Sequence, residues 1–194
     1  RFELLKRTSI LAVLVFFIAM NVSAAQWNID RAHSSVGFTV KHLVISKVKG
    51  TFTDFSGTIN FDGKDYAGSS VEMKVMVGSV DTDDKKRDDH LRSPDFFDVE
   101  KYPEMSFKST KVVKGEGNNF QITGNLTIKD VTKEVTFDCV FNGTVDFMGT
   151  NKAGFSAKTT IDRQDFGVKW SKTLDTGSLV VGNDVEIYLE IEAD

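Results

Sequence analysis

Three histidines, His33, His42 and His90, are the side chains best suited to acid–base or metal chemistry in this sequence. A metal site needs ligands at short, regular spacing, and no two of these histidines form a His-x-His pair or share a helical turn. For an enzyme, we consider the pair Asp30 and His33, which gives catalysis only thin support. The sequence has no glycine-rich phosphate loop, nucleophile elbow or paired catalytic carboxylates. It therefore predicts no metal, no cofactor and no catalytic centre.

Arg87, His33 and His42 are polar candidates for contact with the head group of a ligand. A guanidinium fork suits phosphate or carbonyl oxygens, so Arg87 could bind such a group. Alternatively, Arg87 pairs with Asp88 or Asp81 and holds its own segment in place. His33 and His42 lie on or beside the first long strand, where they would either meet a head group or pack and hydrogen-bond within the fold.

Cys139 and Trp170 each allow two interpretations. Cys139 shares its strand face with Phe137 and Phe141, which favours a small buried hydrophobe over a thiol paired with another chain. Trp170 follows Asp165-Phe166-Gly167 and would either plug one end of the fold or line its mouth.

Alternating apolar and polar residues dominate the chain, which is the pattern of half-buried antiparallel strands. Residues 62–65 and 115–119 are hairpin signals. Asn142-Gly143 is also a turn dipeptide, but the apolar alternation runs through it, so we place that turn at residues 148–152. The alternation runs through these residues: Val36, Phe38, Val40; Val71, Met73, Val75, Val77; Phe120, Ile122, Leu126, Ile128; Val135 to Phe147; Phe155, Ala157, Ile161; Val185, Ile187, Leu189, Ile191.

Two segments depart from this alternation. The apolar frame shifts between Phe52 and Phe55, which predicts a β-bulge near Thr53-Asp54 in one long, bent strand. Residues 81–92 carry acids at their start and Arg92 at their end, which predicts a short helix. The two phenylalanines that follow should point inward beneath this helical cap. The count is about eight strands, so we expect an all-β, antiparallel, eight-stranded barrel.

Composition narrows the range of functions. The 194 residues suit one domain with a sizeable core. Residues 1–25 hold three basic residues and one acid, so the remainder carries −6 against −4 for the whole chain. An acidic domain has no general attraction for nucleic acid. Lys6-Arg7, an apolar run over 10–20 and small residues up to Ala25 predict a secretory signal at 1–25, a barrel domain at 26–194, and a periplasmic or secreted location.

Three stretches resemble the YceI-like family of exported lipid-binding barrels. The first is Asp30-Arg31-Ala32-His33-Ser34-Ser35-Val36-Gly37-Phe38, continued at 41–43, 49–52 and 55–57. The second, and the most specific, is Arg87-Asp88-Asp89-His90-Leu91-Arg92-Ser93-Pro94-Asp95-Phe96-Phe97-Asp98, continued at 101–107. The third is Asp165-Phe166-Gly167 with 180–185. The resemblance follows the chain in order from about residue 30 to its end.

The resemblance implies a lipocalin-like barrel without enzyme activity that carries a long isoprenoid lipid, such as a quinone or prenyl phosphate. The alternatives are an enzyme acting on an isoprenoid or fatty amphiphile, and a ligand-free stress protein. Implied partners are the lipid, a membrane protein that supplies it, and a second copy in a homodimer. Combined with the alternation, the resemblance gives these binding residues: Phe38, Val40, Phe52, Phe55, Ile59, Met73, Val75, Leu91, Phe96, Phe107, Leu126, Phe137, Phe141, Phe155, His33, His42, Arg87 and Trp170.

Overall fold

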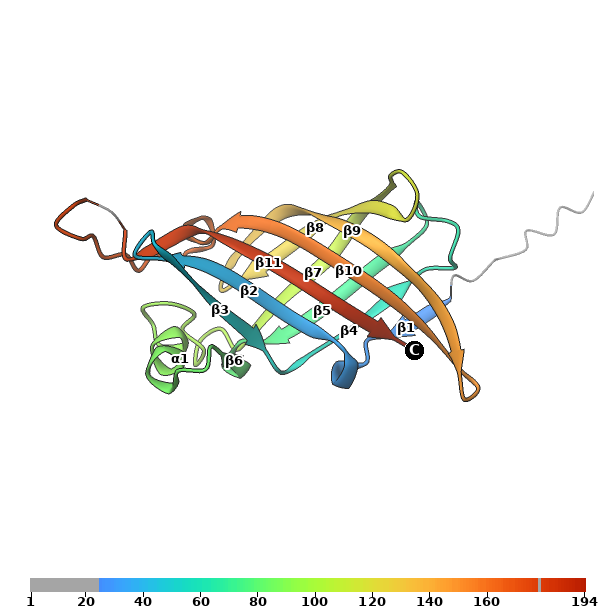
Figure 1. Ribbon diagram of the computed structural model, residues 1–194, viewed down its shortest axis with the longest axis horizontal. Helices are drawn as coiled ribbons and strands as arrows, with labels where there is room; N and C mark the ends of the chain where they lie inside the picture. The colour runs from blue at the N-terminus through green and yellow to red at the C-terminus, as the bar shows by residue number, and fades with distance from the viewer. Residues whose placement is uncertain (1–24, 178) are drawn as a thin grey trace, which may run out of the picture.

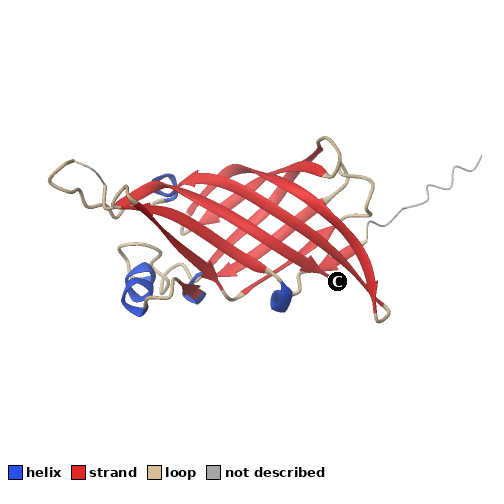
Figure 2. Cartoon of the chain, in the orientation of Figure 1, coloured by secondary structure: helices blue, strands red, loops and turns tan. Residues whose placement is uncertain are grey.

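The computed structural model describes residues 25–177 and 179–194. The expected secretory signal at 1–25 therefore lies, except for Ala25, outside the described residues. Strands dominate, with one α-helix and three 3-10 turns (Figure 2). In chain order the elements are β1 Gln26–Asn28, η1 Arg31–His33, β2 Ser35–His42, β3 Ser46–Phe52, β4 Phe55–Asn60, β5 Ser70–Met76, η2 Val77–Ser79, β6 Val80–Asp81, α1 Lys85–Arg92, β7 Glu104–Lys114, β8 Asn119–Ile128, β9 Val131–Phe147, β10 Thr150–Asp162, η3 Arg163–Phe166 and β11 Val181–Ala193.

All strands belong to one antiparallel sheet with the order β1-β4-β5-β7-β8-β9-β10-β11-β2-β3-β6. The sheet curls around a common interior, and its strands run obliquely along an elongated molecule (Figure 1). β3 and β4 lie near opposite ends of the sheet order, yet only Thr53 and Asp54 separate them in sequence. An isolated bridge between Ile29 and Ala193 links the segment after β1 to the end of β11. The curl therefore brings the β1–β4 side of the sheet back toward β3 and the end of β11.

The all-β antiparallel prediction is confirmed, but the predicted count of eight strands is wrong. Eleven strands form, because β1 and β6 are too short to show an alternating pattern, and because the long bent strand divides into β3 and β4. Phe52 and Phe55 are both buried, as the frame shift predicted, while Thr53 and Asp54 between them are exposed. The change of frame is thus a break between two strands, with different partners on either side, and not a bulge within one.

The predicted turn between the two longest strands is confirmed. β9 runs through Asn142-Gly143, and the chain reverses at Met148 and Gly149, both with positive φ. The predicted helix is also present as α1. Asp84 caps it, since its side chain accepts a hydrogen bond from the backbone N–H of Arg87 at 3.1 Å.

The inward faces of the strands form a single apolar core rich in aromatic rings. Phe96 is buried and Phe97 packs against the core, as expected for the residues after the cap. Cys139 is 3% exposed, which confirms the prediction of a small buried hydrophobe. Gly50 faces inward where the ring of Phe38 crosses it, and a Cβ there would lie 2.4 Å from that ring. Within the described part of the chain, no helix is long and apolar enough to span a bilayer.

Candidate ligand cavity

A cavity of about 390 Å³ runs through the interior of the curled sheet. Most of its wall consists of side chains from β2, β3, β4, β5, β7, β8, β9, β10 and β11, and the rest comes from α1 and the connections at the two ends. A cavity of this size falls within the range of pockets that hold small molecules, and its apolar wall favours a hydrocarbon ligand. Because each strand contributes alternate residues, the wall is continuous along the strands.

All but three of the predicted binding residues line this cavity. Those that do are Phe38, Val40, Phe52, Ile59, Met73, Val75, Leu91, Phe96, Phe107, Leu126, Phe137, Phe155, His42, Arg87 and Trp170. Alternation predicted the apolar members that lie in strands, because successive side chains of a strand point to opposite faces of the sheet. It did not hold at the end of β9, where Val145 and Phe147 are exposed.

Phe55 and Phe141, predicted for the cavity wall, and His33, predicted for contact with a head group, do not line the cavity. Phe55 is buried, but it follows the break between β3 and β4 and fills core space where the chain changes partners. Phe141 lies beside the register shift of β9 and β10, and its ring packs against Phe61 and Phe155. His33 ends the turn η1, whose side chains do not follow strand alternation.

One end of the cavity is closed by aromatic rings that the predicted set omitted. We call this the aromatic end; it comprises Phe61, Tyr66 and Phe120, each buried and each lining the cavity. The centroid of the Tyr66 ring lies 4.9 Å from that of Phe61 and 5.3 Å from that of Phe120. Phe61 and Phe120 continue the alternation of their strands and could have been found from it. Tyr66 lies in the connection after β4, where alternation gives no signal.

The opposite end, beside the helix α1, carries the polar groups. We call this the α1 end; it comprises Thr82, Arg87, His90, His42 and Trp170, all of which line the cavity. Side chains there are mostly half-buried, unlike those at the aromatic end. The wall is therefore tight and apolar at one end and more accessible and polar at the other.

Arg87 is fixed by Thr82 and not by an acid. Its Nε donates to Thr82 Oγ1 at 2.7 Å, and its Nη2 donates to the Thr82 carbonyl at 2.7 Å. The buried carboxylate of Asp88 accepts hydrogen bonds from Thr82 N at 2.9 Å and Thr82 Oγ1 at 2.6 Å. The expected pairing with Asp88 or Asp81 is thus replaced by a relay through Thr82. The relay ties α1 to β6 and holds the guanidinium at the cavity wall.

Trp170 and His90 form an aromatic group beside this relay. The His90 ring lies 5.0 Å from the Phe96 ring and 5.3 Å from the Trp170 ring, edge-on to both. His90 Nε2 is 2.9 Å from the carboxylate of Asp95. The sequence left open whether Trp170 plugs one end of the fold or lines its mouth. In the structure it lines the cavity at the α1 end.

Arg163 holds the backbone that carries Trp170. Its Nη1 donates to the carbonyls of Val168 and Trp170 at 2.7 and 2.8 Å, and its Nε donates to the Gly182 carbonyl at 2.8 Å. Burial lowers the pKa of this guanidinium, but arginine stays protonated in proteins. Sequence reasoning did not single out Arg163. Its place one residue after β10 offered no signal, because the carbonyls that it binds belong to irregular backbone at 168–170 and to Gly182, which have no sequence pattern of their own.

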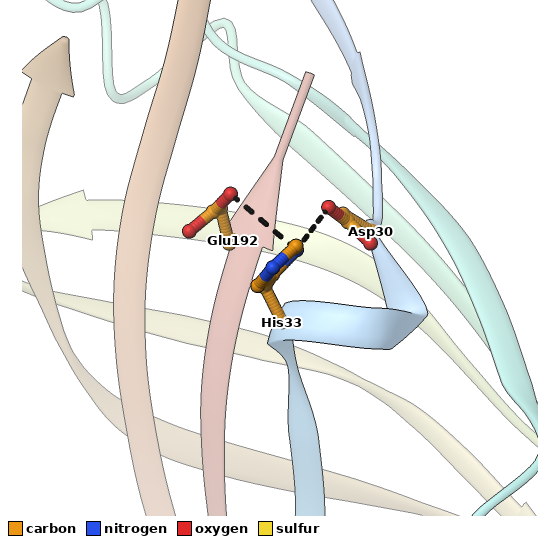
Figure 3. A group of neighbouring side chains, drawn as sticks. All are labelled: Asp30, His33 and Glu192. Carbon is orange, nitrogen blue, oxygen red and sulfur yellow. Dashed lines mark hydrogen bonds and ion pairs between the residues drawn. The ribbon is translucent and has the colours of Figure 1, made fainter. Parts of the chain in front are cut away.

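His33 belongs to a partly buried charge cluster, in which its imidazole lies between Asp30 and Glu192 (Figure 3). Its Nδ1 lies 2.7 Å from Asp30 Oδ2 and 3.9 Å from Glu192 Oε1, so η1 is joined to β11. Lys152 Nζ from β10 lies 2.5 Å from Glu192 Oε1 and 3.5 Å from Asp30 Oδ2. The hydrogen bond that His33 donates to Asp30 raises the pKa of His33 and lowers the pKa of Asp30.

This cluster is the only set of three His, Cys, Asp or Glu ligand atoms within the described residues that is close enough to hold a metal. Lys152 already places a cation between its two carboxylates, so a metal ion would have to displace an ammonium. It also lies away from the cavity, since none of Asp30, His33, Lys152 and Glu192 lines it. We therefore interpret it as an electrostatic clasp between η1, β10 and β11.

Comparison with known proteins identifies the family. A family model described as the YceI-like domain matches residues 27–193. The chain belongs to the YceI-like family. It is 39% identical over 194 residues to a UPF0312 protein of Pectobacterium atrosepticum, covering 97% of each chain. It is 40% identical over 185 residues to protein YceI of Salmonella newport, covering 94% of this chain and 93% of that protein.

Solved structures of YceI-like and related proteins share the fold. The structure of Burkholderia cenocepacia BcnA matches with a TM-score of 0.75 at 29% identity, over 86% of this chain and 99% of that chain. A Campylobacter jejuni YceI protein matches with a TM-score of 0.68 at 36% identity, over 84% and 94%. A polyisoprenoid-binding domain from Saccharophagus degradans, implicated in plant cell wall breakdown, matches with a TM-score of 0.63 at 15% identity, over 88% and 98%. At 15% identity this last likeness concerns the fold alone.

Proposed function

We propose that this YceI-like protein binds one long apolar lipid of isoprenoid type inside its cavity, with the tail along the apolar wall. The observation that carries the proposal is the polarity gradient of the cavity, which is closed by aromatic rings at one end and bears polar groups at the other. A prenyl tail with one polar head fits that gradient. A polyisoprenoid-binding domain has the same fold, so the fold can accommodate this ligand class.

We further propose that the short link between β3 and β4 closes the curled sheet into a lipocalin-like barrel, with β1 and β6 as additional short strands. The two-residue link at Thr53-Asp54 supports this, because β3 pairs with β2 while β4 pairs with β5. Closure removes exposed sheet edges and separates the lumen from water.

The head group would lie at the α1 end, near Arg87, His42 and Trp170. Arg87 lines the cavity and donates to Thr82 through Nε and Nη2, so Nη1 is the guanidinium nitrogen that we assign to the head group. A guanidinium suits phosphate or carbonyl oxygens, so a prenyl phosphate or a quinone head is compatible with this end. Whether the head is a phosphate or a quinone, such as that of ubiquinone, would depend on Arg87 Nη1 and on the neighbouring His42.

The proposed role is carriage and not catalysis. Burying on the order of 500 Å² of a prenyl tail would contribute roughly 12 kcal/mol gross at about 25 cal/mol per Å². Ordering and association costs offset much of that gain, so binding stays reversible. We propose a periplasmic or secreted location, with 1–25 as a cleaved signal and 26–194 as the carrier, and a membrane protein as the donor of the lipid.

The test is lipid mass spectrometry of protein purified from its own host without detergent. We expect one isoprenoid lipid per protein. Native protein that repeatedly contains no lipid, and binds none of the prenyl alcohols, prenyl phosphates or quinones offered to it, would falsify the proposal.

A pair of variants on neighbouring residues localises the binding. Ala157 is half-buried and lines the cavity, while Lys158 beside it is exposed on the outer face of β10. Ala157→Trp should obstruct the lumen and reduce lipid occupancy about tenfold or more, since the displaced tail loses apolar contact. Lys158→Trp should keep wild-type occupancy. Equal occupancy in both variants would place the lipid elsewhere.

A further inference from the structure

The turn between β2 and β3 exposes an apolar tip at the α1 end of the cavity. Val44 is 61% exposed and Ile45 is 87% exposed. The backbone N–H of Leu43 donates to the Val180 carbonyl at 2.9 Å, so the tip stands beside the segment that enters β11 (Figure 1). His42 and Val180 both line the cavity. The tip is therefore continuous with the cavity wall.

The conformation of this tip is costly for the residues that adopt it. Leu43 and Val44 have φ values of 51° and 66°, and Ile45 N donates to the His42 carbonyl at 3.3 Å across the turn. Hairpin turns with two positive φ values are normally formed by Asn-Gly, and a β-branched residue is a clear outlier there. These side chains gain little from packing, because Val44 and Ile45 point into water. Strain of this kind marks a candidate contact with a partner.

The charge around the tip identifies the partner. Residues 39–53 and 166–174 contain five lysines and no acid, with Asp54, Asp165 and Asp175 directly at their borders, although residues 26–194 as a whole are acidic. Lys41, Lys169 and Lys172 are exposed, and Lys47 pairs with Glu186 of β11 at 2.9 Å. Apolar residues ringed by lysines are the pattern of segments that enter the interface of an anionic bilayer.

We propose that the tip formed by residues 43–45 docks the protein on an anionic lipid bilayer, with the α1 end of the cavity facing the membrane. The inference rests on the proposed function, because docking there would let a lipid pass between bilayer and cavity without crossing water. The β9–β10 tip is also apolar, with Phe147 59% and Met148 90% exposed. It lies toward the aromatic end, and residues 138–152 hold two aspartates and a single lysine. Charge and position therefore favour the β2–β3 tip.

The experiment compares two variants in co-sedimentation with vesicles of phosphatidylcholine, with and without phosphatidylglycerol. The tip variant carries Leu43→Asn, Val44→Gly and Ile45→Ser, which suit the turn, so it should fold and unfold at a higher urea concentration than wild type. We expect its affinity for phosphatidylglycerol vesicles to fall about tenfold or more, because the aliphatic side chains that would enter the bilayer, above all Val44 and Ile45, are lost. The control variant, Phe147→Ser with Met148→Asn, should bind like wild type.

Three outcomes would overturn the docking inference. These are wild-type protein that ignores both kinds of vesicle, a control variant that loses as much affinity as the tip variant, and a tip variant that still binds fully. The lipid content of the purified protein tests the proposed function independently of docking. If the protein carries lipid but the tip substitutions leave vesicle binding unchanged, only the docking inference is wrong. If the protein never carries lipid, the carrier role is wrong, even where the protein binds vesicles.

Discussion

The two ends of the cavity are built differently. At the aromatic end, Phe61 is 4% exposed, and its ring lies within 5.1 Å of the rings of Tyr66 and Phe141. At the α1 end, Trp170 and His42 are half-buried, and hydrogen bonds through Thr82 fix the cap. Stability is therefore concentrated in packing at one end, while the other end is held by polar contacts that can yield locally.

The largest expected effect is on packing at the aromatic end. Phe61→Ala removes a fully packed ring and should lower the free energy of unfolding by about 3–5 kcal/mol. Trp170→Ala at the α1 end should cost less than half as much, because its ring is half-buried. Urea denaturation of both variants measures the difference. Equal losses would mean that the two ends do not differ in packing.

Removal of the ligand should come next in size and act mainly at the α1 end. A lipid present at about a hundredfold excess over its Kd stabilises the folded state by about 2.7 kcal/mol. Delipidation should therefore lower the unfolding midpoint and accelerate amide hydrogen exchange in α1 more than in β8. If amide exchange instead rises most in β8, the α1 end is not the more accessible end of the cavity.

Breaking the Thr82 relay should have a smaller effect. Asp88→Ala leaves the backbone N–H and hydroxyl of Thr82 without their buried acceptor, which should cost about 2 kcal/mol. Asp89→Ala is the matched control, since Asp89 is exposed and pairs only with Lys85 and Arg92 at the surface. Its loss should stay below about 1 kcal/mol. Comparable losses would show that the relay does not hold the cap.

The smallest expected change in stability comes from the electrostatic clasp around His33, and this change depends on pH. The folded state raises the pKa of His33 above its ordinary 6.5 through the bond to Asp30. The stabilisation is therefore complete below pH 6.5 and is lost as pH rises through the raised folded-state pKa. His33→Gln should consequently fall further below wild type in urea midpoint at about pH 5.5 than at about pH 8.5. The opposite order would contradict the clasp.

The sequence predicted the wall of the cavity better than its ends. Alternation sets the inward face wherever a strand is long, so residues such as Phe38, Leu126 and Phe137 were assigned to the wall and lie there. It fails where strands stop, which is why His33 was misplaced and Tyr66 was missed. The partner of Arg87 was mistaken because acids are the obvious choice, while Thr82 and Asp88 meet only once α1 packs against β6.

The strand count failed for a related reason. A frame shift at Thr53-Asp54 indicates an irregularity, but a bulge and a break give the same sequence pattern. The two differ in the strands that pair on either side, and those partners lie far away in the chain. Short strands such as β1 depend on the same long-range pairing, because three residues carry no period of their own.

Cys139 adds a consequence for the handling and lifetime of the protein. Burial raises the pKa of its thiol to about 12, so almost none of it is thiolate near neutral pH. Two copies cannot be cross-linked through this sulfur unless the sheet opens, and dissolved oxidants meet an unreactive form. Cys139 also lines the cavity. A small uncharged alkylating reagent should therefore modify it faster in protein without lipid, and the rate of alkylation would report how much of the protein carries lipid.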